Sequence, residues 1–130
     1  MLNYLPDGEL QLETKEAVAP DLGRLASRLK VLADPRRLTI LDMLMEGVQC
    51  NCEIAERLDV SLSLISYHLR ILSEAGLVQS ERDPDDARWL YYSVNRKALE
   101  ELSGALAHLL DVRRIRPRQP SCGPRRCENC

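Results

Sequence analysis

The chain has 130 residues, with 45% apolar and 29% charged residues and a formal net charge of −2. This length suits one domain of ordinary size, and the composition is that of a globular protein rather than a disordered or membrane-embedded one. The N-terminus lacks the basic start and apolar run of a signal peptide, so we expect a cytoplasmic protein.

Charge is unevenly distributed along the chain. Residues 1–60 carry 7 basic and 11 acidic side chains, whereas residues 61–130 carry 11 and 9. Six arginines and no acidic residue lie between Arg113 and Arg126. Because charges act over about 8 Å in physiological salt, a locally basic region can bind phosphate on a mildly acidic chain. We interpret the arginine run itself as a solvated linker.

Apolar residues at helical spacing predict four successive helices, over 21–33, 35–47, 50–58 and 61–76. Asp34 followed by proline is a strong helix start, Ser61 or Ser63 is expected to cap the fourth helix, and Gly76 is expected to end it. With no Phe and one Trp in the chain, the core is expected to be mainly aliphatic.

The pattern then changes to that of strands. β-rich runs at 77–78 and 89–94 flank turn residues at 83–86, which predicts a two-stranded hairpin. A last helix is expected from Arg96 to about Val112. These elements divide the chain into a flexible acidic arm at 1–19, a folded domain at 20–112 and an Arg/Pro/Cys-rich tail at 113–130.

The short helix, turn and longer helix over 50–75 form a candidate helix-turn-helix, which presents the N-terminal end of its second helix to the major groove. The hairpin is placed to act as a wing, with Arg82 and Arg88 near its tip within reach of phosphates. The second-helix residues predicted to face DNA are Ser61, Ser63, Ser66, Tyr67, His68 and Arg70. This polar surface argues against the alternative of a purely structural dimerisation module. The sequence holds no phosphate loop, nucleophile–base pair or paired catalytic carboxylates, so we expect no enzymatic activity.

Three motifs resemble the ArsR/SmtB family of metalloregulatory repressors, in particular its arsenic-sensing type. They are LADPRRLTIL at 32–41, SLSLISYHLRILSEAGLV at 61–78 and RWLYY at 88–92. The resemblance covers roughly 21–112. It implies a mainly α-helical winged helix-turn-helix fold in the order α-α-α-α-β-β-α. It also implies a homodimer, joined through the first and last helices, that represses an operon by binding operator DNA until an inducer binds.

The five cysteines form two close groups rather than a disulfide framework. In the resembled family, a Cys-x-Cys at the start of the third helix is the soft-metal or arsenic site, which assigns that role to Cys50 and Cys52. Thiolates are soft ligands, and a helix N-terminus lowers the pKa of a thiol. Residues i and i+2 of a regular helix do not face each other, so an ion held by both sulfurs is expected to distort the first turn.

A trigonal arsenite site needs three sulfurs. The family's common third position falls here on Ala55, a departure from the pattern, and residues 1–49 contain neither Cys nor His. The remaining sources are Cys122, Cys127 and Cys130 in the tail, from the same chain or across a dimer. Arsenite or antimonite is the expected inducer. Four thiolates would instead suit cadmium, lead or zinc, and a thiol redox switch is a third hypothesis.

His108 and Asp111 match half of the interfacial site of zinc-sensing relatives. The other half would need an Asp and a His at positions held here by Asn95 and Lys97, and a lysine is a poor partner for a cation. We therefore interpret His108 as a packing or dimer-interface histidine.

Overall fold

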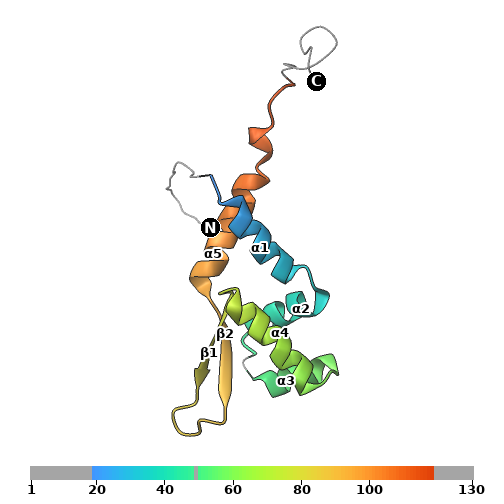
Figure 1. The fold of residues 1–130 in the computed structure, drawn as a ribbon, viewed down its shortest axis with the longest axis vertical. Coiled ribbons are helices and arrows are strands. Elements are labelled where there is room, and N and C mark those ends of the chain that lie inside the picture. The colour runs from blue at the N-terminus through green and yellow to red at the C-terminus, as the bar shows by residue number, and fades with distance from the viewer. Residues whose placement is uncertain (1–18, 49, 119–130) are drawn as a thin grey trace.

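The computed structural model describes residues 19–48 and 50–118, which form five α-helices and a two-stranded antiparallel hairpin (Figure 1). The elements are α1 (Leu22–Leu32), α2 (Pro35–Met45), α3 (Asn51–Leu58), α4 (Leu62–Glu74), β1 (Val78–Arg82), β2 (Leu90–Val94) and α5 (Arg96–Leu109), then a 3₁₀ turn at Val112–Arg114. This order confirms the predicted winged helix-turn-helix fold. All but the last residue of the arm at 1–19, and the tail from residue 119, lie outside the described residues.

Side-chain caps fix where the helices begin. Asp34 accepts hydrogen bonds from the backbone N–H groups of Arg36 (2.8 Å) and Arg37 (3.2 Å) at the start of α2. Ser61 accepts one from the N–H of Leu64 (3.1 Å), so it is Ser61 that caps α4. Each such cap stabilises its helix by about 1 kcal/mol.

Helix α5 ends at Leu109, earlier than the apolar spacing predicts. Asp111 accepts a hydrogen bond from the backbone N–H of Arg113 (3.0 Å) and pairs with its guanidinium (2.9 Å). These bonds, the side-chain one foremost, hold the pKa of Asp111 at about 2. Arg114 donates to the carbonyls of His108 (2.8 Å) and Leu109 (3.1 Å). The chain is thereby turned out of the helix.

The core is aliphatic, as predicted, and lies where α2, α3 and α4 meet the hairpin. Its fully buried side chains are Ile40, Ile54, Ile65, Leu69, Leu72 and Leu77. Burying one side chain of this size stabilises the fold by about 1.5–3 kcal/mol. Ile54 of α3 and Ile65 of α4 belong to the same cluster, so packing fixes the two helices of the helix-turn-helix relative to each other.

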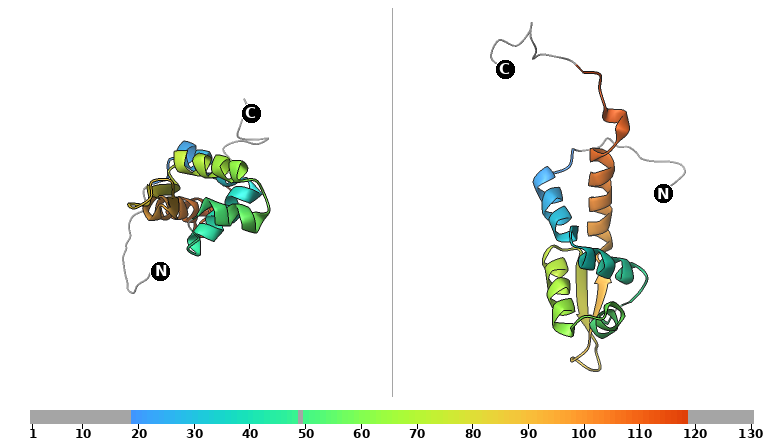
Figure 2. Two further views of the ribbon diagram at one scale, coloured as in Figure 1. Left: turned by 90° about the horizontal axis from the view of Figure 1, so that it is seen from below. Right: turned by 90° about the vertical axis from the view of Figure 1, so that its right-hand side faces the viewer.

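The elements gather at two ends of the molecule (Figure 2). Helices α3 and α4 and the hairpin lie together at one end, while α1 and α5 run side by side at the other. The hairpin register runs from Val78 opposite Val94 to Arg82 opposite Leu90, so its turn projects beyond the helices. Within residues 19–48 and 50–118, no helix has the length and apolar character needed to cross a membrane.

Candidate DNA interface and thiol site

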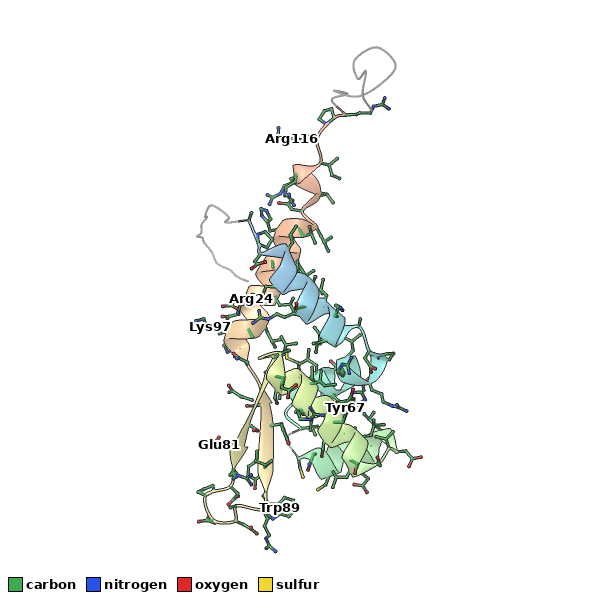
Figure 3. The ribbon with its side chains drawn as sticks, in the orientation of Figure 1. Arg24, Tyr67, Glu81, Trp89, Lys97 and Arg116 are labelled. Carbon is green, nitrogen blue, oxygen red and sulfur yellow. The ribbon has the colours of Figure 1, made fainter. Side chains whose placement is uncertain are left out.

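Six residues at 61–70 are predicted to contact DNA, and five of them lie on the outward side of α4 and its N-cap. Those five, Ser61, Ser63, Ser66, Tyr67 and Arg70, are all exposed. The Tyr67 side chain is 47% exposed and lies on the surface of α4 (Figure 3). A shallow open groove follows this face and is lined by Leu62, Ser63, Ser66, Tyr67 and Arg70. Its hydroxyls, phenol and guanidinium are hydrogen-bonding groups of the kind that read base edges.

Tyr67 and Glu74 hold Arg70 over the outward face of α4, which we call the reading face because it carries the residues predicted to contact DNA. Its guanidinium lies 5.5 Å from the centre of the Tyr67 ring and 3.6 Å from a Glu74 carboxylate oxygen. Both contacts are exposed, and exposed pairs of this kind contribute about 1 kcal/mol or less. Arg70 can therefore exchange Glu74 for a nucleic acid at small cost.

The prediction that His68 faces outward is wrong. Its side chain is 4% exposed, because it lies on the same side of α4 as Ile65 and Leu72. His68 Nδ1 is 3.3 Å from Nη1 of Arg37, whose Nε donates to the Val31 carbonyl at 2.6 Å. His68 thus joins α4 to the corner between α1 and α2 and positions α4 from its buried side.

Neutral His68 accepts a hydrogen bond from Arg37 through Nδ1. Protonation of His68 would remove this acceptor, so the stability of the fold is expected to depend on pH. Burial lowers the pKa of His68 below its ordinary value of 6.5, the Asp34 carboxylate opposes that shift, and the Arg37 and Arg36 charges add to it. Between the lowered pKa and 6.5, the unfolded chain binds more protons than the folded chain. We therefore expect the free energy of unfolding to fall as pH drops below 6.5, measured by urea denaturation between about pH 7.5 and about pH 5.5.

Two glutamine variants isolate this effect. His68→Gln should remove the loss of stability over this pH range, whereas His108→Gln should keep it. His108 is the chain's other histidine and lies half-buried on α5. Equal acid sensitivity in the wild type and the His68→Gln variant would contradict the prediction.

The two predicted wing arginines lie at the hairpin tip, but each already has a partner. Arg82 donates to the Ala87 carbonyl (2.5 Å) and so closes the loop. Arg88 donates from Nε (3.0 Å) and Nη2 (2.8 Å) to the Asp86 carboxylate, with its side chain 87% exposed. Segment 82–88 holds two arginines and three aspartates, a net charge of −1. Arg88 must therefore leave Asp86 to bind a phosphate.

Cys50 and Cys52 lie together at the N-terminal end of α3, with Cys50 outside the helix. Cys50 is the N-cap residue with extended backbone (φ −100°, ψ 130°), and exposed Cys52 lies in the first turn. Both thiols approach one acceptor, Asn51 Oδ1, at 4.0 Å and 3.6 Å. Because Cys50 is not helical, the i, i+2 separation on a regular helix does not apply. The predicted need to distort the first turn loses its geometric basis.

The expectation of a lowered thiol pKa at this helix end is also wrong for Cys52. The hydrogen bond with the neighbouring Cys50 thiol raises the pKa of Cys52, and burial and the Cys50 charge add to that shift. Ala55, at the family's third ligand position, is buried in the core. No group of three metal-ligating side chains gathers within the described part of the chain. The predicted tail ligands Cys122, Cys127 and Cys130 lie outside it.

Asn95 caps α5, and it stands at a position where the zinc site of zinc-sensing relatives would need a ligand. Its side chain accepts from the Ala98 N–H (3.2 Å) to cap α5 and donates to the Gly76 carbonyl (3.0 Å). Lys97 is exposed nearby on α5 (Figure 3).

Tyr91 belongs to the thiol site although the sequence gives no sign of it. Cys50 pairs with Tyr91 of β2 in an isolated antiparallel bridge. This contact joins residues far apart in the sequence, so no local pattern could have indicated it. The thiol pair is thus placed between the helix-turn-helix and the wing.

Comparisons with known proteins agree with this geometry. Residues 34–80 match the family described as "Bacterial regulatory protein, arsR family". The chain is 35% identical over 99 residues to the arsenical resistance operon repressor of Bacillus subtilis, covering 75% of this chain and 86% of that protein. It is 25% identical to the cadmium resistance transcriptional regulatory protein CadC homolog of Staphylococcus aureus, over 88% of this chain and 93% of that protein.

Among solved structures, one described as a possible transcriptional regulator for arsenical resistance superposes with a TM-score of 0.57 at 34% identity. The match covers 64% of this chain and 83% of that one.

Proposed function

Since the chain belongs to the arsR family of bacterial regulatory proteins, we propose that it represses transcription by binding operator DNA as a homodimer, and that arsenite or antimonite bound by Cys50 and Cys52 releases it. The family places it among transcriptional regulators, not enzymes. The observation that carries the proposal is the pair of adjacent, accessible thiols on the helix that packs directly against the reading helix α4.

The chemistry of the pair suits a trivalent arsenical. Arsenite presents As–OH groups, and each thiol that binds forms one As–S bond as one As–O bond breaks. The thiol proton leaves with the hydroxide as water, and neither arsenic nor sulfur changes oxidation state. Sulfur ligands select such soft ions over hard cations. The predicted third sulfur, from Cys122, Cys127 or Cys130, would complete a trigonal site.

The shape of the molecule suits a dimer on DNA. Exposed apolar side chains gather on α1, on α5 and just beyond α5, at the end opposite the reading face: Leu22, Leu29, Leu109, Leu110, Val112 and Ile115. Pairing two copies through this end would bury that surface and point two α4 helices at successive major grooves.

One observation favours a second candidate ion. The Staphylococcus aureus cadmium regulatory homolog matches over more of this chain than the Bacillus subtilis repressor does. Cadmium, lead or zinc bound by four thiolates is therefore the alternative inducer, with two sulfurs supplied by the tail.

Two measurements test the proposal: binding of the ion to the protein, and the loss of operator affinity that the ion causes. We expect arsenite and antimonite to bind the full chain, as seen in the mass of the intact complex, and to lower operator affinity by about 5- to 150-fold in fluorescence anisotropy. Cadmium and zinc are the comparison ions. Release by cadmium but not arsenite would support the alternative, and release by oxidant alone, reversed by dithiothreitol, would support a redox switch. Equal affinity for operator and random duplex would contradict a repressor altogether.

A further inference from the structure

The hairpin is joined to the thiol pair through the backbone of β2. Tyr91 pairs with Glu81 of β1 on one side and with Cys50 on the other. Cys50 therefore makes an isolated bridge to the edge of the hairpin at β2. Any ligand that changes the backbone of Cys50 acts directly on β2.

The Tyr91 side chain extends this connection to the turn of the hairpin. Its hydroxyl donates to Asp83 Oδ2 at 2.8 Å, and Asp83 Oδ1 accepts from the backbone N–H groups of Asp85 (2.8 Å) and Asp86 (3.0 Å). The bond to Tyr91 lowers the pKa of Asp83 and raises that of Tyr91, to which the nearby Cys50 charge also contributes. Asp83 thus holds the turn in shape while Tyr91 holds Asp83.

The last step reaches the arginine at the tip. Asp86 accepts from both the backbone N–H (3.1 Å) and the guanidinium of Arg88. A continuous set of contacts therefore runs from Cys50 through Tyr91, Asp83 and Asp86 to Arg88. It is separate from the packing of α3 against α4.

We infer that Tyr91 is a positioning residue through which the Cys50–Cys52 thiol pair controls the wing. The inference rests on the proposed function and adds a second route to it. An arsenical held by both sulfurs would constrain the torsions of Cys50, and the extended backbone of Cys50 is what pairs with Tyr91. Loss of that pairing frees β2 and the turn, so the hairpin tip that carries Arg88 is no longer fixed relative to α4. The bond balance is that of the proposed function, with two As–S bonds formed and two water molecules released.

Trp89 allows this movement to be measured without DNA. It is the only tryptophan of the chain, it is 46% exposed, and it lies on the hairpin between Arg88 and β2 (Figure 3). Its emission and its quenching by acrylamide therefore report on the wing alone. The experiment titrates the full chain with arsenite and follows Trp89, while the mass of the intact complex gives arsenic uptake.

Tyr91→Phe and Tyr92→Phe form a matched pair of variants. Each removes one hydroxyl from β2, but Tyr92 is buried on the core side of the strand, whereas Tyr91 is on the exposed side with its hydroxyl on Asp83. Loss of an exposed phenol hydroxyl leaves the fold intact, which circular dichroism checks. A third variant, Asp83→Asn, removes the charged acceptor of the same bond.

We expect the wild type and Tyr92→Phe to show a Trp89 change that saturates together with arsenic uptake. Tyr91→Phe and Asp83→Asn should take up arsenic equally, yet give a smaller Trp89 change, and their arsenite-induced loss of operator affinity should shrink by about threefold to tenfold.

Arsenic uptake by the wild type with an unchanged Trp89 signal would overturn the inference and leave the proposed function standing. A full Trp89 change in Tyr91→Phe would also overturn the inference, since it would mean that the wing responds to arsenic without the hydrogen bond between Tyr91 and Asp83. Absence of arsenic uptake by the wild type would overturn the proposed function and this inference together.

Discussion

A chain carrying Cys50→Ser and Cys52→Ser is expected to bind operator DNA as tightly as the wild type and to ignore arsenite. Neither thiol is part of the hydrophobic core, and the pairing of Cys50 with Tyr91 does not depend on its sulfur, so the DNA-binding end should fold normally. The arsenite-induced loss of affinity, about 5- to 150-fold for a typical allosteric coupling, should fall to no measurable change. Fluorescence anisotropy on a labelled operator, with and without arsenite, measures it.

The matched comparison is a chain ended after Arg118, which removes the tail cysteines and keeps Cys50 and Cys52. It should still bind the operator and still respond, but only at higher arsenite concentration, because one thiolate ligand is lost while the link to the DNA-binding end remains. A truncated chain that ignores arsenite, beside a double serine variant that responds normally, would place the sensor in the tail.

The second large effect is expected on the reading face of α4. Replacing Ser66, Tyr67 or Arg70 by Ala should lower the ratio of operator to random-duplex affinity, with about 1–3 kcal/mol lost for each base contact removed. The same loss on both duplexes would mean that this face does not read sequence.

Arg88→Ala and Lys97→Ala are the comparison variants. If Arg88 contacts a phosphate, Arg88→Ala should weaken binding to operator and random duplex alike, and it should reduce the slope of log affinity against log salt by about one. Lys97 is a matched exposed cation on α5, away from the reading face, and its removal should change neither quantity.

Local chemistry made much of the fold predictable. Asp34 and Ser61 predict the starts of α2 and α4, because each is a short polar side chain that precedes apolar residues at helical spacing. Such a side chain can accept hydrogen bonds from the free N–H groups of the first helical turn. The end of α5 was mispredicted because apolar spacing continues past Leu109, while the bonds of Asp111 to Arg113 turn the chain out of the helix.

The site was only partly predictable. His68 was misplaced although its spacing from Ile65 and Leu72 is that of one helix face, so the signal was present and was outweighed by the polarity of the side chain. The bridge between Cys50 and Tyr91 is a different case, because it is formed by tertiary packing and leaves no trace in the spacing of nearby residues.

The outward turn of the chain after α5 limits which tail cysteine can complete the thiol site. Beyond α5 the ribbon continues away from α3, and α5 alone is about 21 Å long. Cys122 is the fourth residue after Arg118, a tether of at most about 14 Å, which is too short to return along the chain's own α5. Cys127 and Cys130 have tethers of up to about 32 Å and about 43 Å. A third sulfur from the same chain must therefore be one of these two, while Cys122 can serve only another copy.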